Sequence, residues 1–174
     1  MRYSLELARP VLMRTPLVLY AMLGDLPEEW TRHGEAPGAW SPHQVVAHLT
    51  HIEESDWLDR TRVILEHGTD RAFDPVDREA GFDRFEGVSL DDLIGRFSDV
   101  RSTNLLLLEG LVRGLDLSRR GTHPDFGQVR LDQLLATWVV HDFNHIGQIV
   151  KTMAKQYTDA VGPWRAYLPI LDAP

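Results

Sequence analysis

Two histidines late in the chain have a spacing that suits metal binding. His141 and His145 are four residues apart in a segment whose apolar residues repeat with a helical period. Residues four apart on a helix are stacked neighbours about 6 Å apart, so both imidazoles can reach one divalent cation. The zinc-protease motif is absent, because Asp142 and Phe143 stand where its glutamate would be. The pair predicts a metal site, with two hydrogen-bonded core histidines as the alternative.

A third ligand is available on another amphipathic segment. His48 lies on the same predicted helical face as Val45 and Ile52. Three histidines from two helices would leave a vacant position on Zn²⁺ or a similar cation, which is how catalytic zinc sites are built. His43, in the first turn of this segment, and His51, further round toward solvent, remain alternative third ligands.

Three further polar side chains are candidates for catalysis. Arg101 and Asn104 fall on the apolar face of a third helical segment, and Gln148 falls on the face that carries His145. An inward arginine needs an anion, which is either Asp56 or another carboxylate of the chain, or a substrate carboxylate held by the planar guanidinium. Gln148 would help to position a bound water molecule or a substrate.

Four amphipathic segments must position these side chains, and convincing strand alternation is absent. A capping box begins the second segment at Ser41, Ser89 caps the third, and Thr15 followed by proline predicts a kink or a restart within the first, with the threonine as cap. We therefore predict an all-α four-helix bundle with one longer connection (69–88) and a short C-terminal tail around 162–165. The segments cover about 4–23, 42–67, 90–114 and 130–157.

The composition describes one acidic domain over residues 1–174. There are 18 Lys and Arg against 26 Asp and Glu, a net charge of −8, so the basic footprint needed for nucleic acid or an anionic membrane surface is missing. No apolar stretch reaches the roughly 20 residues that span a bilayer. Glu6 and Pro10 interrupt the region where a signal peptide would be apolar. We expect a cytoplasmic protein.

The chain contains no cysteine, which excludes disulfides, thiolate zinc sites, iron–sulfur ligation and a cysteine nucleophile. Any soft-metal or redox chemistry must therefore come from the eight histidines or from a bound molecule. Two of these, His67 at a helix end and His123 in a connecting loop, are expected to be exposed and without a function. Trp30, Trp40 and Trp164 are expected to be buried by packing of the loop and the tail on the bundle, with a role in a pocket wall as the alternative.

Four stretches in order along the chain resemble the DinB-like family of metal-binding four-helix bundles, whose superfamily includes bacillithiol- and mycothiol-dependent transferases. The resemblance implies a divalent ion, Zn or Ni above all, held by His48, His141 and His145. Family members often have an acidic residue three positions after the first of these ligands, where this chain has His51, so the resemblance does not identify the group that orients His48. The stretches are 40–49, 121–127, 134–149 and 162–165.

Our leading hypothesis is a metal-dependent enzyme, a thiol-dependent S-transferase that acts on a small molecule. With no cysteine in the chain, the thiol must be a low-molecular-weight cofactor, and a cation would stabilise its thiolate. The alternatives are a metal-dependent hydrolase, for which Gln148, Asn144, Asn104 or an unplaced carboxylate would assist the water, and a non-catalytic, stress-related metal-binding dimer. We expect that the chain can form a homodimer through helix faces, because bundles with remaining apolar surface often pair symmetrically. Three imidazoles also suit Cu or Fe, so the sequence leaves the metal, the substrate and the pairing face open.

Overall fold

Helices form nearly all of the regular structure in the computed structural model, which describes residues 1–172. The predicted all-α four-helix bundle is confirmed, and none of the described helices is long and apolar enough to cross a membrane. The elements are α1 (Leu5–Leu12), α2 (Thr15–Leu23), α3 (Glu28–Thr31), α4 (Pro42–Ser55), α5 (Trp57–His67), α6 (Ala80–Phe85), α7 (Leu90–Val112), β1 (Arg120–His123), β2 (Gly127–Arg130), α8 (Leu131–Lys155) and the 3₁₀ helices η1 (Gly162–Tyr167) and η2 (Pro169–Leu171).

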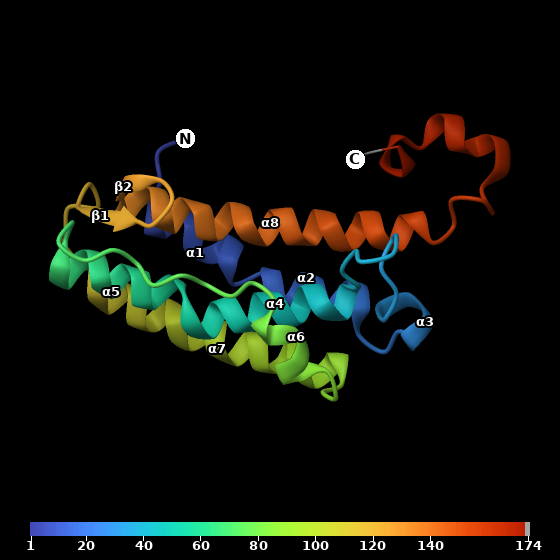
Figure 1. The fold of residues 1–174 in the computed structure, drawn as a ribbon, viewed down its shortest axis with the longest axis horizontal. Coiled ribbons are helices and arrows are strands. Elements are labelled where there is room, and N and C mark those ends of the chain that lie inside the picture. Colours follow the sequence, from blue (N-terminus) through green and yellow to red (C-terminus); the bar gives the residue numbers. More distant parts are fainter. Residues whose placement is uncertain (173–174) are drawn as a thin grey trace.

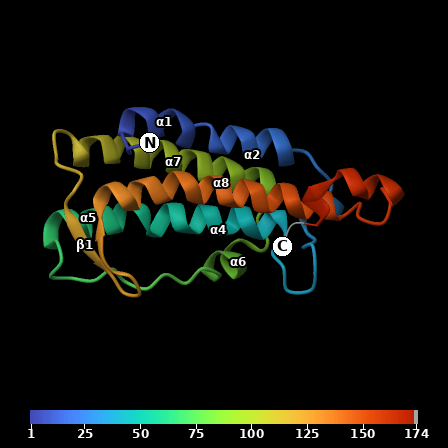
Figure 2. The same ribbon diagram turned by 90° about the horizontal axis from the view of Figure 1, so that it is seen from above.

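Four rods make up the bundle, and two of them consist of a pair of helices: α1 with α2, α4 with α5, α7, and α8 (Figures 1 and 2). In Figure 1 the α1–α2 rod and α8 run from left to right, whereas the α4–α5 rod and α7 run from right to left. Because α4–α5 and α7 are consecutive and run the same way, the connection between them must return along the whole bundle. This is the predicted longer connection, and it contains α6.

The two rods that consist of two helices are broken for different reasons. The restart predicted at Thr15 is confirmed, but the threonine cap is wrong: Arg14 is the N-cap, and the Thr15 hydroxyl donates to Asp142 at 2.6 Å. The segment 42–67, predicted as one helix, is interrupted at Asp56, whose backbone leaves the helical region (φ −123°, ψ −63°). Asp56 makes no side-chain cap, so its carboxylate is free for another partner.

The predicted caps hold where the sequence signal was complete. The Ser41 hydroxyl accepts from the Gln44 N–H while the Gln44 side chain accepts from the Ser41 N–H, which is the full capping box. Ser89 likewise accepts from the Asp92 N–H at 3.1 Å. These caps fix where α4 and α7 begin, and through α4 they fix the position of His48.

Arg101 lies at the centre of the bundle with no exposed surface, and all five of its N–H groups are used. Its Nε and Nη2 donate to Glu53 at 2.9 and 3.0 Å, its Nη1 and Nη2 donate to Asp142 at 2.6 and 3.0 Å, and its Nη1 also donates to the Leu12 carbonyl at 2.8 Å. Burial alone would lower the pKa of Arg101, but the two carboxylates reverse this and raise it. The guanidinium therefore joins α1, α4, α7 and α8 as a permanent cation.

This network confirms one expectation for Arg101 and corrects another. The structural ion pair with carboxylates of the chain is present, and its partners are Glu53 and Asp142, whereas Asp56 pairs with Arg60 at 2.6 Å. A role for Arg101 in binding a substrate carboxylate is contradicted, because no N–H group remains free and none is exposed. Asn104 is buried in the same network, where its amide donates to the Glu53 backbone carbonyl at 2.7 Å.

The connection 121–127, predicted as a loop, corrects the expectation that strands are absent. It forms the antiparallel hairpin β1–β2, with Gly121 paired to Val129. A Cβ at Gly121 would lie 2.6 Å from Ile64, so the glycine allows β1 to lie directly against α5.

Residues 72–79, hereafter the strap, begin at this hairpin and lead to α6. The Phe73 N–H donates to the Thr122 carbonyl at 2.9 Å, which adds the first part of the strap to the edge of β1. At the other end, Gly81 lies so close to α4 that a Cβ there would be 2.6 Å from the Ala47 carbonyl oxygen. Both ends of the strap are thus held, and Figure 2 shows it running beside the α4–α5 rod.

The tail after α8 differs from its expected packing. All of η1 is exposed, and Trp164 keeps 70% of its surface open, so the expected burial of this tryptophan is wrong. The chain returns to α8 only at η2, where Leu171 is buried (Figure 1). The last two residues of the predicted domain, 173 and 174, lie outside the described part.

Candidate metal centre

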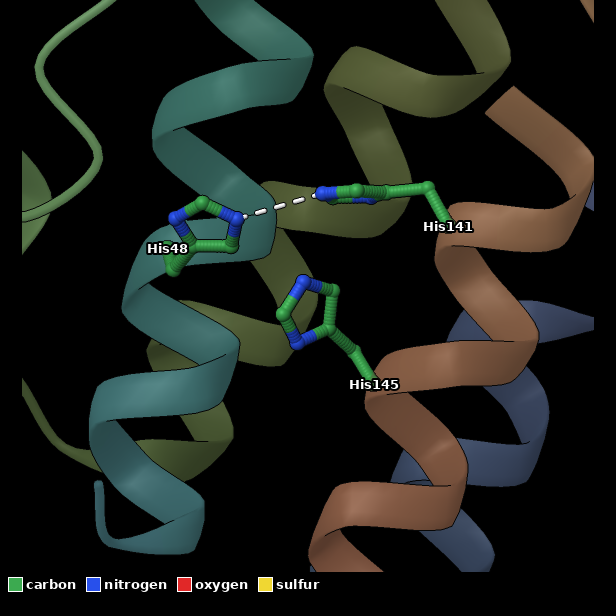
Figure 3. Close-up of side chains that lie close together, drawn as sticks. All are labelled: His48, His141 and His145. Carbon is green, nitrogen blue, oxygen red and sulfur yellow. Dashed lines mark hydrogen bonds between the residues drawn. The ribbon is translucent and has the colours of Figure 1, made fainter. Parts of the chain in front are cut away.

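Three histidines converge between α4 and α8 (Figure 3). His48 projects from α4, and His141 and His145 project from successive turns of α8. One ring nitrogen from each lies within 4.8 Å of the other two, and the Nε2 atoms of His48 and His141 are 3.2 Å apart. The structure therefore brings together the three residues expected as ligands, and they could hold one metal ion.

The outward nitrogen of two of these rings is held by an acceptor. Nδ1–H of His48 donates to the Arg78 carbonyl at 2.8 Å, and Nδ1–H of His145 donates to the Gln148 side-chain oxygen at 2.8 Å. These bonds place the proton on Nδ1 and leave the lone pair of Nε2 free, which is the tautomer that a metal ligand needs. Nδ1 of His141 is buried without a hydrogen-bond partner among the described residues.

Distances and protonation both fit a divalent cation. Two nitrogens bound to one tetrahedral zinc at about 2.0–2.1 Å are about 3.3 Å apart, close to the observed Nε2 separation of His48 and His141. Burial lowers the pKa of His48 to about 4 and that of His141 to about 3, and it also lowers the pKa of His145. All three rings are therefore neutral at pH 7, which is the form that coordinates metals.

Two tryptophans enclose the triad. The Trp40 ring lies parallel to His145, with centroids 6.1 Å apart, and packs on His48 at 5.0 Å. The Trp57 ring meets His141 edge-on at 5.2 Å. Trp40 was expected either to be buried by loop packing or to form a pocket wall, and the structure supports the pocket wall. The two aromatic rings cover the triad and so explain why it is desolvated.

The competing histidines lie apart from the triad. His43 is buried, but its Nε2 bonds the Val88 carbonyl at 2.9 Å. His51 offers no nitrogen to the group. The group that orients His48, which the resemblance did not identify, is the Arg78 carbonyl of the strap.

The triad lies in the wall of a pocket of about 590 Å³, a volume suited to a small molecule. The pocket lies between the α4–α5 rod and α8, and the strap and the β1–β2 turn complete its lining. Besides the triad, its lining includes Trp40, Ile52, Asp56, Trp57, Arg60, Phe73, Val76, His123, Phe126, Leu134, Thr137 and Asn144.

The sequence analysis missed several of these lining residues or predicted another role for them. Asp56 was considered only as a partner of Arg101, and Arg60 was not singled out. His123 was expected to be exposed, yet it is half-buried in the pocket wall with its ring stacked on Phe126 at 4.4 Å. His67, in contrast, is exposed as expected. The aspartate and arginine four residues apart were the available signal, but such pairs are common on exposed helix surfaces.

Gln148 acts on the site through His145, and this gives a testable expectation. Gln148→Leu should weaken zinc binding about 10- to 100-fold, because His145 loses the acceptor that fixes its tautomer and ring orientation. Gln148→Glu keeps an acceptor and should retain the affinity. Competition with a chromophoric chelator measures both. Gln128→Leu on the exposed hairpin is the control, and equal affinity of the Gln148→Leu and Gln128→Leu variants would contradict the assignment.

Comparisons with known proteins agree with this architecture. The family model described as the DinB superfamily matches residues 12–149. Among solved structures, the chain is similar to YfiT from Bacillus subtilis, described as a probable metal-dependent hydrolase with an unusual four-helix bundle topology. The match has a TM-score of 0.74 and 21% sequence identity and covers 87% of each chain, which establishes a shared fold. No curated protein sequence matches the chain significantly.

Proposed function

The chain belongs to the DinB superfamily, and from that premise we propose that it is a metal-dependent enzyme that converts a small molecule in this pocket. One observation carries the proposal: three neutral imidazole nitrogens converge in the wall of a pocket large enough for a substrate. Three protein ligands leave one position of a tetrahedral cation open, as in catalytic zinc sites. Zinc or nickel is the expected ion. The description of YfiT as a probable metal-dependent hydrolase supports a metal-dependent enzyme.

Transfer of a low-molecular-weight thiol is the reaction that the donor set favours. A divalent cation bound at the triad would lower the pKa of a thiol at its open position, so a separate base is unnecessary. No carboxylate of residues 1–172 joins the group of the three histidines, and the chain has no cysteine of its own. The thiol sulfur would form a bond to an electrophilic carbon, the leaving group would depart with its electron pair, and the thiol proton would pass to solvent.

Hydrolysis is the second candidate, and one observation favours it. Asp56 lines the pocket, and burial raises its pKa to about 6, against the opposing effect of Arg60. A carboxylate with such a pKa is ionised at pH 7 and can accept a proton from water. Gln148 and Asn104, considered earlier for this role, are engaged elsewhere, whereas Asp56 and Asn144 both line the pocket.

Turnover measurements distinguish these candidates. Zinc-loaded and nickel-loaded protein would be assayed with an alkyl halide, an epoxide and an activated ester, each with and without a panel of small thiols. We expect thioether formation that requires both metal and thiol and that is lost in His141→Ala but kept in His51→Ala. Ester cleavage that requires metal and not thiol would favour the hydrolase instead. Absence of metal-dependent turnover with every electrophile would contradict the proposed enzyme.

A further inference from the structure

Arg60 is a half-buried cation whose hydrogen-bonding capacity is largely unused. Its side chain is only 16% exposed, and its one ionic partner is Asp56, which its Nε approaches at 2.6 Å. The guanidinium carbon lies 5.3 Å from the centre of the Phe73 ring. Within residues 1–172, neither terminal amino group of Arg60 has a hydrogen-bond partner. The buried Nε makes no hydrogen bond despite its closeness to Asp56, and the terminal amino groups have no protein acceptor, so this end of the guanidinium is suited to a ligand.

Two other arginines show that this situation is specific to Arg60. Arg101 is more deeply buried, and all of its N–H groups are satisfied by protein acceptors. Arg62, on the same helix as Arg60, pairs with Asp59 at 2.7 Å, but its side chain is 42% exposed, so water can solvate the rest. Arg60 alone of the three combines a closed environment with free donors, and it faces the pocket.

The position of Arg60 relative to the triad sets the shape of the ligand. His48, Ile52, Asp56 and Arg60 follow one another at intervals of four along the α4–α5 rod, and all four line the pocket. The twelve residues from His48 to Arg60 correspond to a rise of about 18 Å along the rod, so Arg60 lies well away from His48 within the same cavity. The end at Arg60 adjoins the β1–β2 hairpin, where Phe73, His123 and Phe126 supply aromatic walls.

From these observations we propose that Arg60 binds a carboxylate of the substrate, through its two terminal amino groups, at the end of the pocket remote from the triad. The inference rests on the proposed function in that it treats the pocket as the substrate site. It adds the substrate class: an extended small molecule with a carboxylate at one end, an apolar middle and its reactive group at the triad. The planar fork of a guanidinium matches a carboxylate with two parallel hydrogen bonds.

Asp56 keeps Arg60 ready for such a ligand. Its carboxylate faces the Nε side of the guanidinium, so the opposite edge, formed by Nη1 and Nη2, stays open. Phe73 covers one face of the group and limits how the guanidinium can turn. A ligand carboxylate therefore meets an oriented partner, which reduces the entropy lost on binding.

The test uses 4-phenylbutanoate and its uncharged counterpart 4-phenylbutanamide as probes. Binding of each would be measured by calorimetry on metal-free and on zinc-loaded protein, for the wild type, Arg60→Gln and the matched control Arg62→Gln. We expect the carboxylate to bind about tenfold or more tightly than the amide, with or without zinc. Arg60→Gln should abolish the preference and Arg62→Gln should keep it. Arg60→Lys, which retains the charge but not the fork, should keep only part of it.

Failure of the Arg60 subsite can be distinguished from failure of the proposed metal-dependent activity. The subsite is overturned if neither probe binds, if both bind equally, or if Arg60→Gln retains the preference. Metal content and thiol-dependent turnover are measured on other samples, so a failed subsite leaves the proposed function standing. Conversely, carboxylate preference in the metal-free protein supports the subsite even if no turnover is found. If Arg60→Gln does not fold, the comparison of Arg60→Lys with the wild type decides.

Discussion

Arg101→Met is expected to lower the free energy of unfolding by about 3 to 5 kcal/mol. The substitution removes the only cation from a fully buried network and leaves the carboxylates of Glu53 and Asp142 facing each other without compensation. The side-chain volume is nearly kept, so the loss arises from unpaired charge and not from a cavity. Urea denaturation followed by circular dichroism measures the change.

Arg96→Met is the matched control. Arg96 lies on the same helix, α7, and also pairs with a glutamate, Glu54, at 2.6 Å, but its side chain is 49% exposed. We expect a loss of less than about 1 kcal/mol there, as for other exposed ion pairs. Adding Glu53→Gln and Asp142→Asn to Arg101→Met should recover part of the stability, because the repelling charges are gone. Similar decreases in the free energy of unfolding for Arg96→Met and Arg101→Met would contradict the claim that burial makes the Arg101 ion pairs important.

Alanine in place of any one of His48, His141 and His145 is expected to reduce bound zinc from about one equivalent per chain to none after dialysis. Two imidazoles do not complete a zinc site of this type, since catalytic sites use three protein ligands. A shared cation would also account for three neutral, desolvated imidazoles whose nitrogens lie within 4.8 Å of one another, with the Nε2 atoms of His48 and His141 3.2 Å apart. Elemental analysis of the purified variants gives the stoichiometry.

His51→Ala provides the control for this series. His51 follows His48 by three residues on α4 and was an alternative ligand in the sequence, but it lies outside the triad. Its substitution should leave the zinc stoichiometry unchanged. A wild-type protein that binds no metal, or single triad variants that keep a full equivalent, would show that the histidines form a purely structural core group.

The sequence predicted the parts of the site that depend on local periodicity. The 3.6-residue repeat of two helices places His48, His141 and His145 on inward faces, and the family resemblance favoured His48 over His43 and His51 as the third ligand. The same repeat correctly placed Arg101 inside the bundle. What it could not supply was the identity of the partners, because Glu53 and Asp142 come from other helices whose rotation depends on packing.

The pocket beyond the triad depends on contacts between distant segments and was not predicted. Asp56 and Arg60 resemble an ordinary pair on a helix surface until the strap and the hairpin cover them. That cover arises from the contact of Phe73 with Thr122, which no local pattern encodes. The close approach at Gly121 was the one available hint, because a glycine within a short strand often marks a place where another element comes near.

The strap is shared by the metal centre and the pocket, and this ties two equilibria together. Through the carbonyl of Arg78 it holds His48, and through Phe73 and Val76 it covers the cavity. A ligand that displaced the Arg78 carbonyl from His48 would change the affinity of the triad for metal, and metal would then change the affinity for that ligand by the same factor. In that case a dissociation constant for either one would be defined only at a stated concentration of the other.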